Sequence, residues 1–235
     1  MSKQKPKIAV LTGAGISAES GIKTFRDAGG LWEHHDIMEV ASIEGWHNNQ
    51  ALVLNFYNER RRQLAEVQPN AAHKALVELE SRYDVTIITQ NVDDLHERAG
   101  SSHIIHLHGE LKKSRSTADE RLIYPCPGDI LPGDYCEKGS QLRPHIVWFG
   151  EMVPMLELAA EAVSRADFIL ITGTSMQVYP AAGLTAYARP NIPIFYVDPK
   201  PMLNYELENA GNLRVISEKA TTGVRKVVDE LIQIE

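Results

Sequence analysis

The chain has 235 residues, of which 43% are hydrophobic and 23% are charged, values close to ordinary globular usage. Its formal net charge of −7 argues against non-specific binding to nucleic acid, and no apolar run approaches the roughly 18 residues of a membrane span. The start of the chain leaves no room for a signal peptide and two cysteines cannot form a disulfide framework, so we expect a cytoplasmic protein that binds neither membranes nor nucleic acid.

Short apolar runs along the chain each end in a glycine-rich or polar cluster. Their near-continuous apolar character, without alternation, is typical of parallel strands that are covered on both faces. The five runs are residues 8–11, 85–88, 168–171, 194–197 and 213–216.

Helical patterns alternate with these runs. Asn70 is suited to cap a helix that carries Leu76 and Leu79 on one face, residues 155–165 are rich in helix formers, and residues 224–232 carry an apolar stripe. The alternation predicts an α/β fold with a doubly wound, parallel, Rossmann-like sheet. Ligands of such sheets bind outside the carboxyl ends of the strands, where the polar clusters would gather.

Two stretches fit the alternation poorly. Residues 34–66 have a helical pattern, and residues 112–140 are rich in proline and glycine. We expect both to be insertions that pack together as a small domain. The remaining segments, 1–33, 67–111 and 141–235, would form the Rossmann-like domain.

A glycine-rich turn follows the first predicted strand. Residues 13–18 match the G-x-G-x-x-G/A pattern, whose glycines let the backbone approach a pyrophosphate at a helix N-terminus. The pattern alone is a weak signal, because an ordinary strand–helix turn uses the same residues. The acidic residue expected roughly 20 positions later at a strand end is not convincingly present, which disfavours an ordinary dehydrogenase.

The residues after this turn give a more specific pattern. Phe25 and Arg26 follow the turn, and the whole run resembles the signature of the sirtuin family. The resemblance continues, in the order found in the family, through four further blocks. These are residues 89–93, 106–109, 142–151 and 173–175.

The resemblance implies an NAD-dependent protein lysine deacylase of bacterial type. Sirtuins consume NAD as a co-substrate: the acyl oxygen of a modified lysine attacks the ribose carbon that bears nicotinamide, and nicotinamide leaves. A histidine then accepts a proton from a ribose hydroxyl, so that the sugar oxygen can attack the acyl group. The products are free lysine and an O-acyl-ADP-ribose, and the partners are acylated lysine side chains of proteins.

Three residues are implied to be catalytic by the same resemblance. His108 would be the base, a role suited to a side chain that titrates near neutral pH, and Asn91 and Asp93 would hold the nicotinamide amide and the ribose hydroxyls. From the residues alone, His108 could be structural, or could ligate a metal together with His106 on the same strand face. Asn91 and Asp93 could equally form a turn.

The cofactor site is implied to include a larger set of residues. Phe25 would shield the reacting sugar from water, and Arg26 would position phosphate or ribose unless it forms a surface ion pair. Tyr196 stands where the family usually has an asparagine, and Asp198 could take over its role. The expected NAD contacts are Gly13, Ala14, Gly15, Ser17, Ala18, Glu19, Thr24, Phe25, Arg26, Trp32, Gln90, Asn91, Val92, Asp93, Gly173, Thr174, Ser175, Asp198 and Ala220.

The substrate site is implied to contain two further groups. Val147, Trp148, Phe149 and Gly150 would form the lysine tunnel and a strand edge to which a peptide adds, although core packing would also explain the two aromatic residues.

Tyr57 and Arg60 resemble the tyrosine–x–x–arginine pair of desuccinylase-type sirtuins. They share a helix face and could bind a carboxylate, unless Arg60 belongs to a solvated basic face with Arg61 and Arg62. On this basis we expect removal of succinyl and malonyl groups as well as acetyl groups.

The segment that usually binds structural zinc in sirtuins departs from the family pattern. Most sirtuins use two C-x-x-C pairs, but here Cys136 has Gly133 three positions earlier, and Cys126 has no partner at that spacing. Because zinc takes four nitrogen or sulfur ligands, we expect no structural zinc, and residues 112–140 would be a degenerate zinc module. A site completed by histidine or carboxylate is the alternative.

Other functions remain open beside deacylation. NAD hydrolysis and mono-ADP-ribosyl transfer use the same activated ribose, and a non-catalytic module could sense NAD or ADP-ribose. The presence of His108, Asn91, Asp93 and residues 148–150 argues against the sensor.

Overall fold

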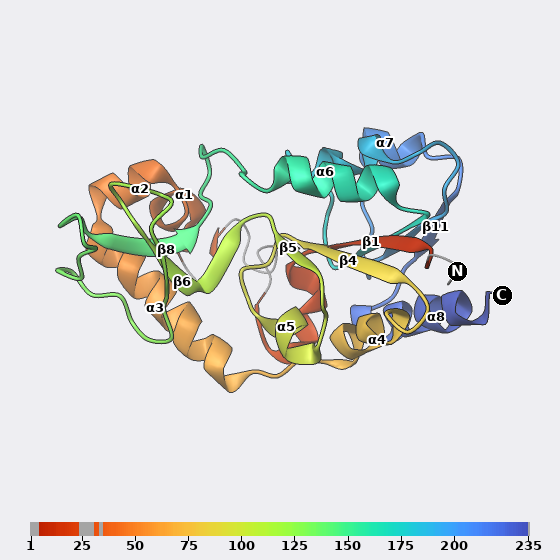
Figure 1. Ribbon diagram of the computed structural model, residues 1–235, viewed down its shortest axis with the longest axis horizontal. Helices are drawn as coiled ribbons and strands as arrows, with labels where there is room; N and C mark the ends of the chain where they lie inside the picture. Colours follow the sequence, from red (N-terminus) through yellow and green to blue (C-terminus); the bar gives the residue numbers. More distant parts are fainter. Residues whose placement is uncertain (1–4, 24–30, 33–34, 235) are drawn as a thin grey trace.

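A six-stranded parallel sheet forms the larger part of the fold. The computed structural model describes residues 5–23, 31–32 and 35–234, and the strands of this sheet lie in the order β11-β10-β9-β1-β4-β5 (Figure 1). All five apolar runs are strands of it, and β5 is a further strand, so the expected Rossmann-like fold is confirmed. The strands are β1 (Lys7–Thr12), β4 (Asp84–Thr89), β5 (Ile104–His106), β9 (Phe168–Thr172), β10 (Ile194–Val197) and β11 (Leu213–Ile216).

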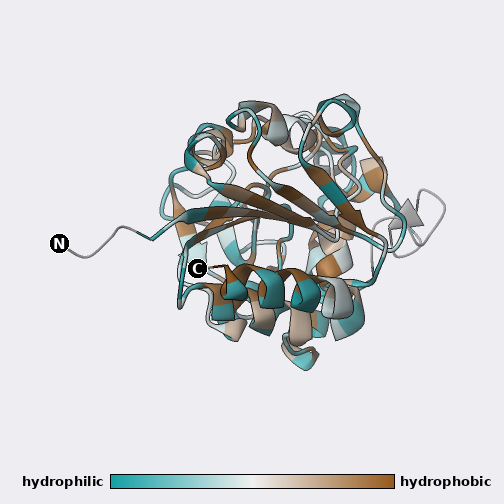
Figure 2. Ribbon diagram, turned by 90° about the vertical axis from the view of Figure 1, so that its right-hand side faces the viewer, coloured by the Kyte–Doolittle hydropathy of each residue, from teal (hydrophilic) through white to brown (hydrophobic). Residues whose placement is uncertain are grey.

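Helices cover both faces of this sheet (Figure 1). Ile8 and Val10 of β1 pack with α4 and α8 on one face, whereas Ala9 and Leu11 pack with the helices of the other face. Because both faces are buried, every residue of the strand interior is apolar. Figure 2 shows the apolar strands between helices whose outer surfaces are more hydrophilic. The helices are α4 (Ala71–Leu79) and α8 (Ala220–Gln233) on the first face, and α6 (Leu156–Arg165), η3 (Ala181–Tyr187) and α7 (Tyr205–Glu208) on the second.

The start of α4 also fixes the glycine-rich turn. The Asn70 side chain accepts a hydrogen bond from the backbone N–H of Ala72, and the Asn70 N–H donates to His73, which closes a capping box. The Asn70 amide group also donates to the carbonyl of Ile16 at 2.7 Å and to the hydroxyl of Ser20 at 3.0 Å. The helix begins where the sequence predicts, and its cap holds the turn after β1.

A smaller part of the chain contains helices and a three-stranded antiparallel sheet, in the order β7-β6-β8. A separate two-stranded sheet pairs β2 with β3. The sequence predicts helices over residues 34–66 but not these sheets, because their strands are short or polar. The elements are β2 (Leu31–Trp32), β3 (His35–Asp36), α1 (Ile37–Val40), α2 (Ile43–Asn48), α3 (Gln50–Glu66), β6 (Gly109–Ser116), β7 (Ile123–Pro125) and β8 (Leu142–Ile146).

Hydrogen bonds and a shared core join the two expected insertions. Asn58 on α3 exchanges two hydrogen bonds of 2.9 Å with the backbone of Ile130, and Arg61 donates to the carbonyl of Leu111 at 2.8 Å. Trp148 belongs to the same core, and β8 pairs with β6. Trp148 and β8 were nevertheless assigned to the larger domain from the sequence. The division into two domains therefore stays a proposal whose boundaries near residues 111 and 141 need adjustment. Among the described residues, no helix combines the length and the apolar character that a membrane crossing requires.

Candidate active site

The strand order of the large sheet reverses between β1 and β9. β4 and β5 follow on one side of β1, whereas β9, β10 and β11 follow on the other side. In doubly wound sheets, ligands bind outside the carboxyl ends of the strands at such a switch point. Gly13 follows β1 and Gly173 follows β9, so the two glycine-containing turns meet there.

The two turns are in direct backbone contact. The Gly15 N–H donates to the Gly173 carbonyl at 2.8 Å, and a Cβ atom added to Gly15 would lie 2.7 Å from the Gly173 Cα. Gly173 has a φ of 63°, and its Cβ would lie 2.1 Å from the backbone nitrogen of Ile16. Packing of one turn on the other therefore requires glycine even without a ligand, and the glycine pattern alone does not identify a nucleotide site.

The helix that the pattern predicts after the turn is not present as such. The chain instead forms two short 3₁₀ helices, η1 (Ala14–Ile16) and η2 (Ala18–Ser20), and Gly21 ends the second with a φ of 99°. Several backbone N–H groups of this stretch donate within the protein, for example from Ile16 to the Gly13 carbonyl and from Ser17 to the Ala14 carbonyl. An extended helix dipole is not available there.

A buried polar cluster links the first turn to the loop after β4. The Ser17 hydroxyl donates to a carboxylate oxygen of Asp93 at 3.0 Å, and the Asn91 amide group donates to the Ser17 oxygen at 3.2 Å. Burial raises the pKa of Asp93 to about 6, although hydrogen bonds from Leu95 and Ser17 and the nearby His106 oppose the shift. At pH 7 the carboxylate is mostly ionised and can accept hydrogen bonds from hydroxyl groups.

Two buried histidines adjoin this cluster, and the sequence did not predict either. The His73 Nε2 atom lies 3.5 Å from the Ser17 oxygen, and the His96 Nε2 atom lies 3.1 Å from the Thr12 hydroxyl. Burial lowers the pKa of His73 to about 4 and that of His96 well below its usual value, so both rings are neutral at pH 7. His73 had one signal, its place three residues after the cap Asn70.

His108 lies at the turn between β5 and β6, with its ring against the end of β4. Its Nδ1 atom lies 3.1 Å from the backbone oxygen of Gln90. Because a carbonyl can only accept, Nδ1 carries the proton in the neutral ring and Nε2 is left with a free lone pair. Burial lowers the pKa of His108, so the neutral form predominates at pH 7. The Gln90 side chain in turn donates to the Thr174 hydroxyl at 2.9 Å.

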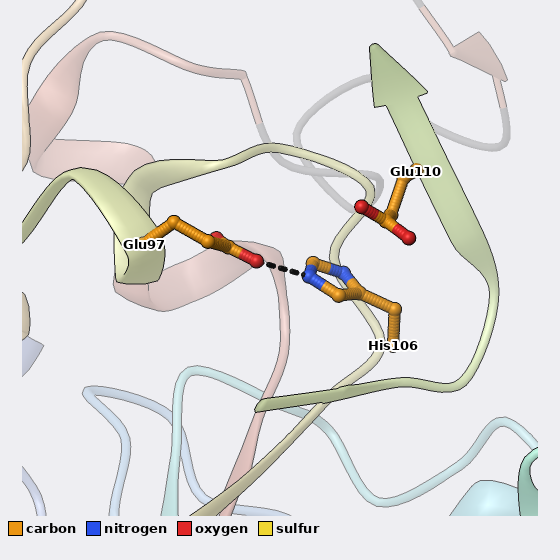
Figure 3. A group of neighbouring side chains, drawn as sticks. All are labelled: Glu97, His106 and Glu110. Carbon is orange, nitrogen blue, oxygen red and sulfur yellow. Dashed lines mark hydrogen bonds and ion pairs between the residues drawn. The ribbon is translucent and has the colours of Figure 1, made fainter. Parts of the chain in front are cut away.

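His106 lies between two carboxylates, Glu97 on α5 (Leu95–Ala99) and Glu110 on β6 (Figure 3). This is the one group of three such side chains in the described part of the chain whose ligand atoms lie within 4.8 Å of one another. Each member already has a partner, because His106 contacts Glu97 at 2.6 Å and Lys113 binds Glu110 at 2.6 Å. His108 is not a member, so the two histidines do not form the metal pair that their spacing allowed.

The expected lysine-tunnel segment lies directly after β8, next to His108. The Val147 N–H donates to the carbonyl of His108 at 2.9 Å, and the Phe149 N–H donates to the carbonyl of Ala41 at 2.9 Å. Residues 147–150 do not continue the strand, apart from an isolated bridge between Phe149 and Ser42. Trp148 is 2% exposed and Phe149 is 42% exposed, so the first packs in the core and the second faces solvent.

A buried ion-pair network, which was not predicted from the sequence, supports this segment. Glu151 accepts hydrogen bonds from the Trp148 N–H at 2.8 Å, from Arg143 at 2.7 Å and from Arg115 at 2.8 Å. The Arg143 guanidinium carbon lies 3.3 Å from the centroid of the Trp148 ring, and the Trp148 indole N–H donates to the Tyr57 hydroxyl oxygen at 3.0 Å. Tyr57 is fully buried, and it holds Trp148 from α3.

The three consecutive arginines of α3 have three different environments. Arg62 is exposed and pairs with Asp129, whereas Arg61 is 3% exposed and bonds to Asn58 and to a backbone carbonyl. The Arg60 side chain is 17% exposed, and its guanidinium carbon lies 5.0 Å from the centroid of the Phe56 ring. Its Nε and Nη1 atoms are buried without a hydrogen-bond partner among the described residues. The run is therefore not one solvated basic face.

Other predicted cofactor residues lie around the same sheet edge. Glu19 accepts two hydrogen bonds from Thr221 at the start of α8, beside Ala220, and Asp198 accepts from the Lys200 N–H. Tyr196 is buried and donates to the Thr174 carbonyl at 2.8 Å. The positions in the loops after β1, β4 and β9 are Gly13, Ala14, Gly15, Ser17, Ala18, Gln90, Val92, Gly173, Thr174 and Ser175. Thr24, Phe25 and Arg26 lie outside the described residues, and of Trp32 only the backbone, in β2, is described.

The two cysteines are both free and buried. The Cys126 thiol contacts the Gly128 carbonyl at 3.2 Å, and the Cys136 thiol contacts the Ser116 hydroxyl at 3.2 Å. Within the ranges that the structure describes, neither cysteine belongs to a group of three ligand side chains close enough for one metal ion.

Comparison with known proteins points to one family. The model of the Sir2 family matches residues 13–180. An NAD-dependent protein deacylase of Helicobacter pylori is 57% identical over 227 residues, which cover 97% of this chain and 98% of that protein. A protein of the same name from Bacteroides thetaiotaomicron is 50% identical over 231 residues, covering 96% of this chain and 97% of that one.

Solved structures give the same result. A Sir2 homologue in complex with NAD has a TM-score of 0.86 and 38% identity, covering 97% of this chain and 90% of that one. A Sir2 variant with a p53 peptide and NAD has a TM-score of 0.78 and 29% identity, covering 96% of this chain and 93% of that one.

Proposed function

The chain belongs to the Sir2 family, the sirtuins, and is an NAD-dependent protein deacylase, and we propose that it removes succinyl and malonyl groups as well as acetyl groups from lysine side chains. The observation that carries the proposal is the guanidinium group of Arg60, which lies beside Phe56 and whose buried Nε and Nη1 atoms have no hydrogen-bond partner among the described residues. The products would be unmodified lysine, nicotinamide and an O-acyl-ADP-ribose.

We propose that NAD binds at the switch point between β1 and β9. The site offers an ionised buried carboxylate in Asp93 and an amide in Asn91, which fit the ribose hydroxyls and the nicotinamide amide. The bound co-substrate supplies a ribose carbon that reacts once nicotinamide leaves. The Ser17 hydroxyl orients both Asn91 and Asp93, because it bonds to the two side chains at once.

We assign His108 as the base of this site. The Gln90 carbonyl holds the proton on Nδ1, so the free Nε2 lone pair is available to accept a proton from a ribose hydroxyl. The lowered pKa of His108 keeps the ring neutral and able to accept that proton at pH 7. The base and the proposed lysine tunnel are held together, since the Val147 N–H donates to the His108 carbonyl.

Arg60 supports the proposed preference for acidic acyl groups. A buried N–H without a partner costs about 1–3 kcal/mol, and a charged donor costs more. A carboxylate at the end of an acyl chain would accept hydrogen bonds from Nε and Nη1 of Arg60, whose Nη2 atom already lies 3.8 Å from a carboxylate oxygen of Glu59. Tyr57, one turn earlier on α3, would support this pocket by fixing the indole ring of Trp148 through its hydroxyl group.

The test of this function is nicotinamide release from NAD in the presence of acetyl-, succinyl- or malonyl-lysine peptides. Release that requires an acylated peptide, with rates on succinyl or malonyl peptide at least equal to those on acetyl peptide, is the expected result. Release without peptide would favour an NAD hydrolase, and no release would favour a sensing module. A preference for acetyl peptide alone would remove the acyl assignment and leave the deacylase.

The free, buried cysteines fit a reducing compartment, and we propose that the enzyme works in the cytoplasm. Fractionation of cells that express the untagged protein tests this location.

A further inference from the structure

The contacts of His106 have no role in the mechanism described above. We propose that His106, held as an imidazolium between the Glu97 carboxylate and the Asn91 backbone carbonyl, is a positioning residue that fixes the loop carrying Asn91 and Asp93. This inference rests on the proposed function, because that loop is assigned to the nicotinamide and ribose.

The protonation of His106 follows from the geometry of its two contacts. The Nδ1 atom lies 3.3 Å from the Asn91 carbonyl oxygen, and the Nε2 atom lies 2.6 Å from Glu97 Oε1. A carbonyl and an ionised carboxylate can only accept hydrogen bonds, whereas a neutral imidazole has a single N–H. Both contacts are satisfied at once only when both ring nitrogens carry a proton, so the ring is cationic.

The surroundings of the ring favour this charge. Glu97 approaches from α5 and Glu110 from β6, as Figure 3 shows, and the side chain of His106 is 9% exposed. Burial alone would lower the pKa of His106, but the hydrogen bond and charge of Glu97 and the charge of Glu110 outweigh it and raise the pKa. Among the described residues, Lys113 pairs with Glu110, and the buried His96 and Asp93 interact electrostatically with His106.

The contact of the His106 ring with the Asn91 carbonyl helps to fix the residue that is proposed to bind nicotinamide. The Asn91 N–H donates to the Thr89 hydroxyl at 3.0 Å, the Asn91 side chain donates to Ser17, and His106 holds the remaining carbonyl. Every polar group of Asn91 except its side-chain oxygen is thus fixed. That oxygen is left to meet the nicotinamide amide.

The same charge stabilises the ionised form of Asp93. A nearby cation favours a carboxylate and lowers its pKa, so the loss of the His106 charge would raise the Asp93 pKa further above its usual range. A raised pKa means that Asp93 becomes protonated at a higher pH. The positioning role therefore predicts a specific change in the pH profile in addition to any loss of stability.

A matched set of variants tests the proposal. His106→Asn keeps an amide donor for the Asn91 carbonyl but removes the charge, and Glu97→Gln keeps an acceptor for the ring but removes the charge that stabilises it. His103→Asn is the control, because His103 is exposed and lies three residues earlier on the same segment.

The measurement is kcat/KM for NAD from pH 5.5 to 9 at saturating acyl peptide. For His106→Asn we expect the decline of kcat/KM on the acid side of the pH profile to begin at a higher pH. At pH 6, kcat/KM should be lower than in the wild type by about three- to tenfold more than it is at pH 8. Glu97→Gln should shift the acid side of the profile in the same direction, but by less. The KM for peptide should be unchanged in both variants, and the His103→Asn control should match the wild type. A lower melting temperature with an unchanged pH profile would overturn the proposal in favour of a purely structural histidine.

NMR of the ¹⁵N-labelled histidine ring separates this proposal from the proposed function, because it needs no turnover. We expect two protonated nitrogens on His106 at pH 7 in the wild type. As the pH is raised, the second proton should be lost at a lower pH in Glu97→Gln than in the wild type, because the charge that stabilises the cation is gone. A neutral His106 ring at pH 7 would overturn the proposal. So would stoichiometric binding of added zinc that His106→Asn abolishes, because a metal ion would occupy the Nε2 lone pair.

Discussion

The Nδ1 atom of His108 lies 3.1 Å from the backbone oxygen of Gln90, and this contact fixes which ring nitrogen can act as a base. Gln90 is itself held, because its N–H donates to the Thr12 carbonyl at 2.9 Å. The base is therefore oriented by the ends of β4 and β1, two neighbouring strands of the sheet. The tautomer of His108 is set by a backbone carbonyl, so no carboxylate partner is needed to hold the proton on Nδ1.

Replacement of His108 by alanine should abolish deacylation while leaving earlier steps largely intact. General-base catalysis contributes about 10²–10⁴-fold, so we expect a loss of that size in acyl transfer to ADP-ribose. In the proposed order nicotinamide leaves before the proton transfer, so exchange of labelled nicotinamide into NAD should persist. Mass spectrometry of the deacylated peptide and the exchange assay measure the two steps. Deacylation within about tenfold of the wild type would refute the assignment.

The pH dependence of the wild-type enzyme should show the raised pKa of Asp93. Because burial raises the pKa of this carboxyl to about 6, the ionised form is present above that pH and is lost as the pH falls through it. We expect kcat/KM for NAD to decline below about pH 6, in step with protonation of Asp93 and His108. A flat profile down to pH 5 would show that ionised Asp93 is not required.

The large sheet could be predicted from the sequence because its signals are local. Five of its six strands contain a nearly continuous apolar run, since residues such as Ile8 and Ala9 are buried on opposite faces. The sixth, β5, has only three residues and was not predicted. The antiparallel sheet of the small part has no such signal: β6 includes Lys112 and Lys113, and its pairing with β8 joins residues about 30 positions apart. Strands with this polar composition do not differ from loops in a single sequence.

Parts of the site were out of reach for a different physical reason. The hydrogen-bond partners of His73 and His96 are Ser17 and Thr12, which lie more than 50 residues away in the sequence. The capping position of His73 could be noticed in the sequence, but its contact with Ser17 could not. The partners of Glu151 are likewise set by the fold. The site positions that could be predicted are those in the sequence blocks that resemble the sirtuin signature, such as residues 89–93 and 106–109. The roles of these residues are proposals.

Chelation of metal should leave the protein folded. The structural zinc site of sirtuins usually has four cysteine ligands, whereas the Cys126 and Cys136 thiols are hydrogen-bonded to a carbonyl and a hydroxyl. We expect much less than one zinc per chain by elemental analysis and an unchanged melting temperature in EDTA. One bound zinc whose removal lowers the melting temperature would show that the degenerate module still binds metal.

Alanine at Gly173 should destabilise the protein and weaken NAD binding. The residue has a φ of 63°, and its new Cβ would lie 2.1 Å from the Ile16 nitrogen, so the two turns must separate. We expect a loss of at least about 2 kcal/mol in the free energy of unfolding, measured with urea. Gly128→Ala is the control, because its Cβ would meet no atom within 4 Å, and its effect should stay within about 0.5 kcal/mol. Equal effects of the two changes would contradict the packing argument.

Replacement of Arg60 by methionine should lower the activity on succinyl and malonyl groups far more than the activity on acetyl groups. Methionine fills a similar volume beside Phe56 but cannot bind a carboxylate, so the loss of a charged hydrogen bond should lower desuccinylation and demalonylation by about ten- to a hundredfold. Deacetylation should change by less than about threefold, because an acetyl group presents no carboxylate. Initial rates on matched acetyl and succinyl peptides give the ratio.

Arg62→Met is the matched control, since Arg62 lies on the same helix but is exposed and pairs with Asp129. It removes the same charge from the molecule without touching the proposed pocket, so both rates should remain near the wild-type values. A selective loss in Arg60→Met alone would place the carboxylate contact at that side chain. Parallel losses on acetyl and succinyl peptides in Arg60→Met would mean that the buried guanidinium supports the fold of α3 and does not read the acyl group.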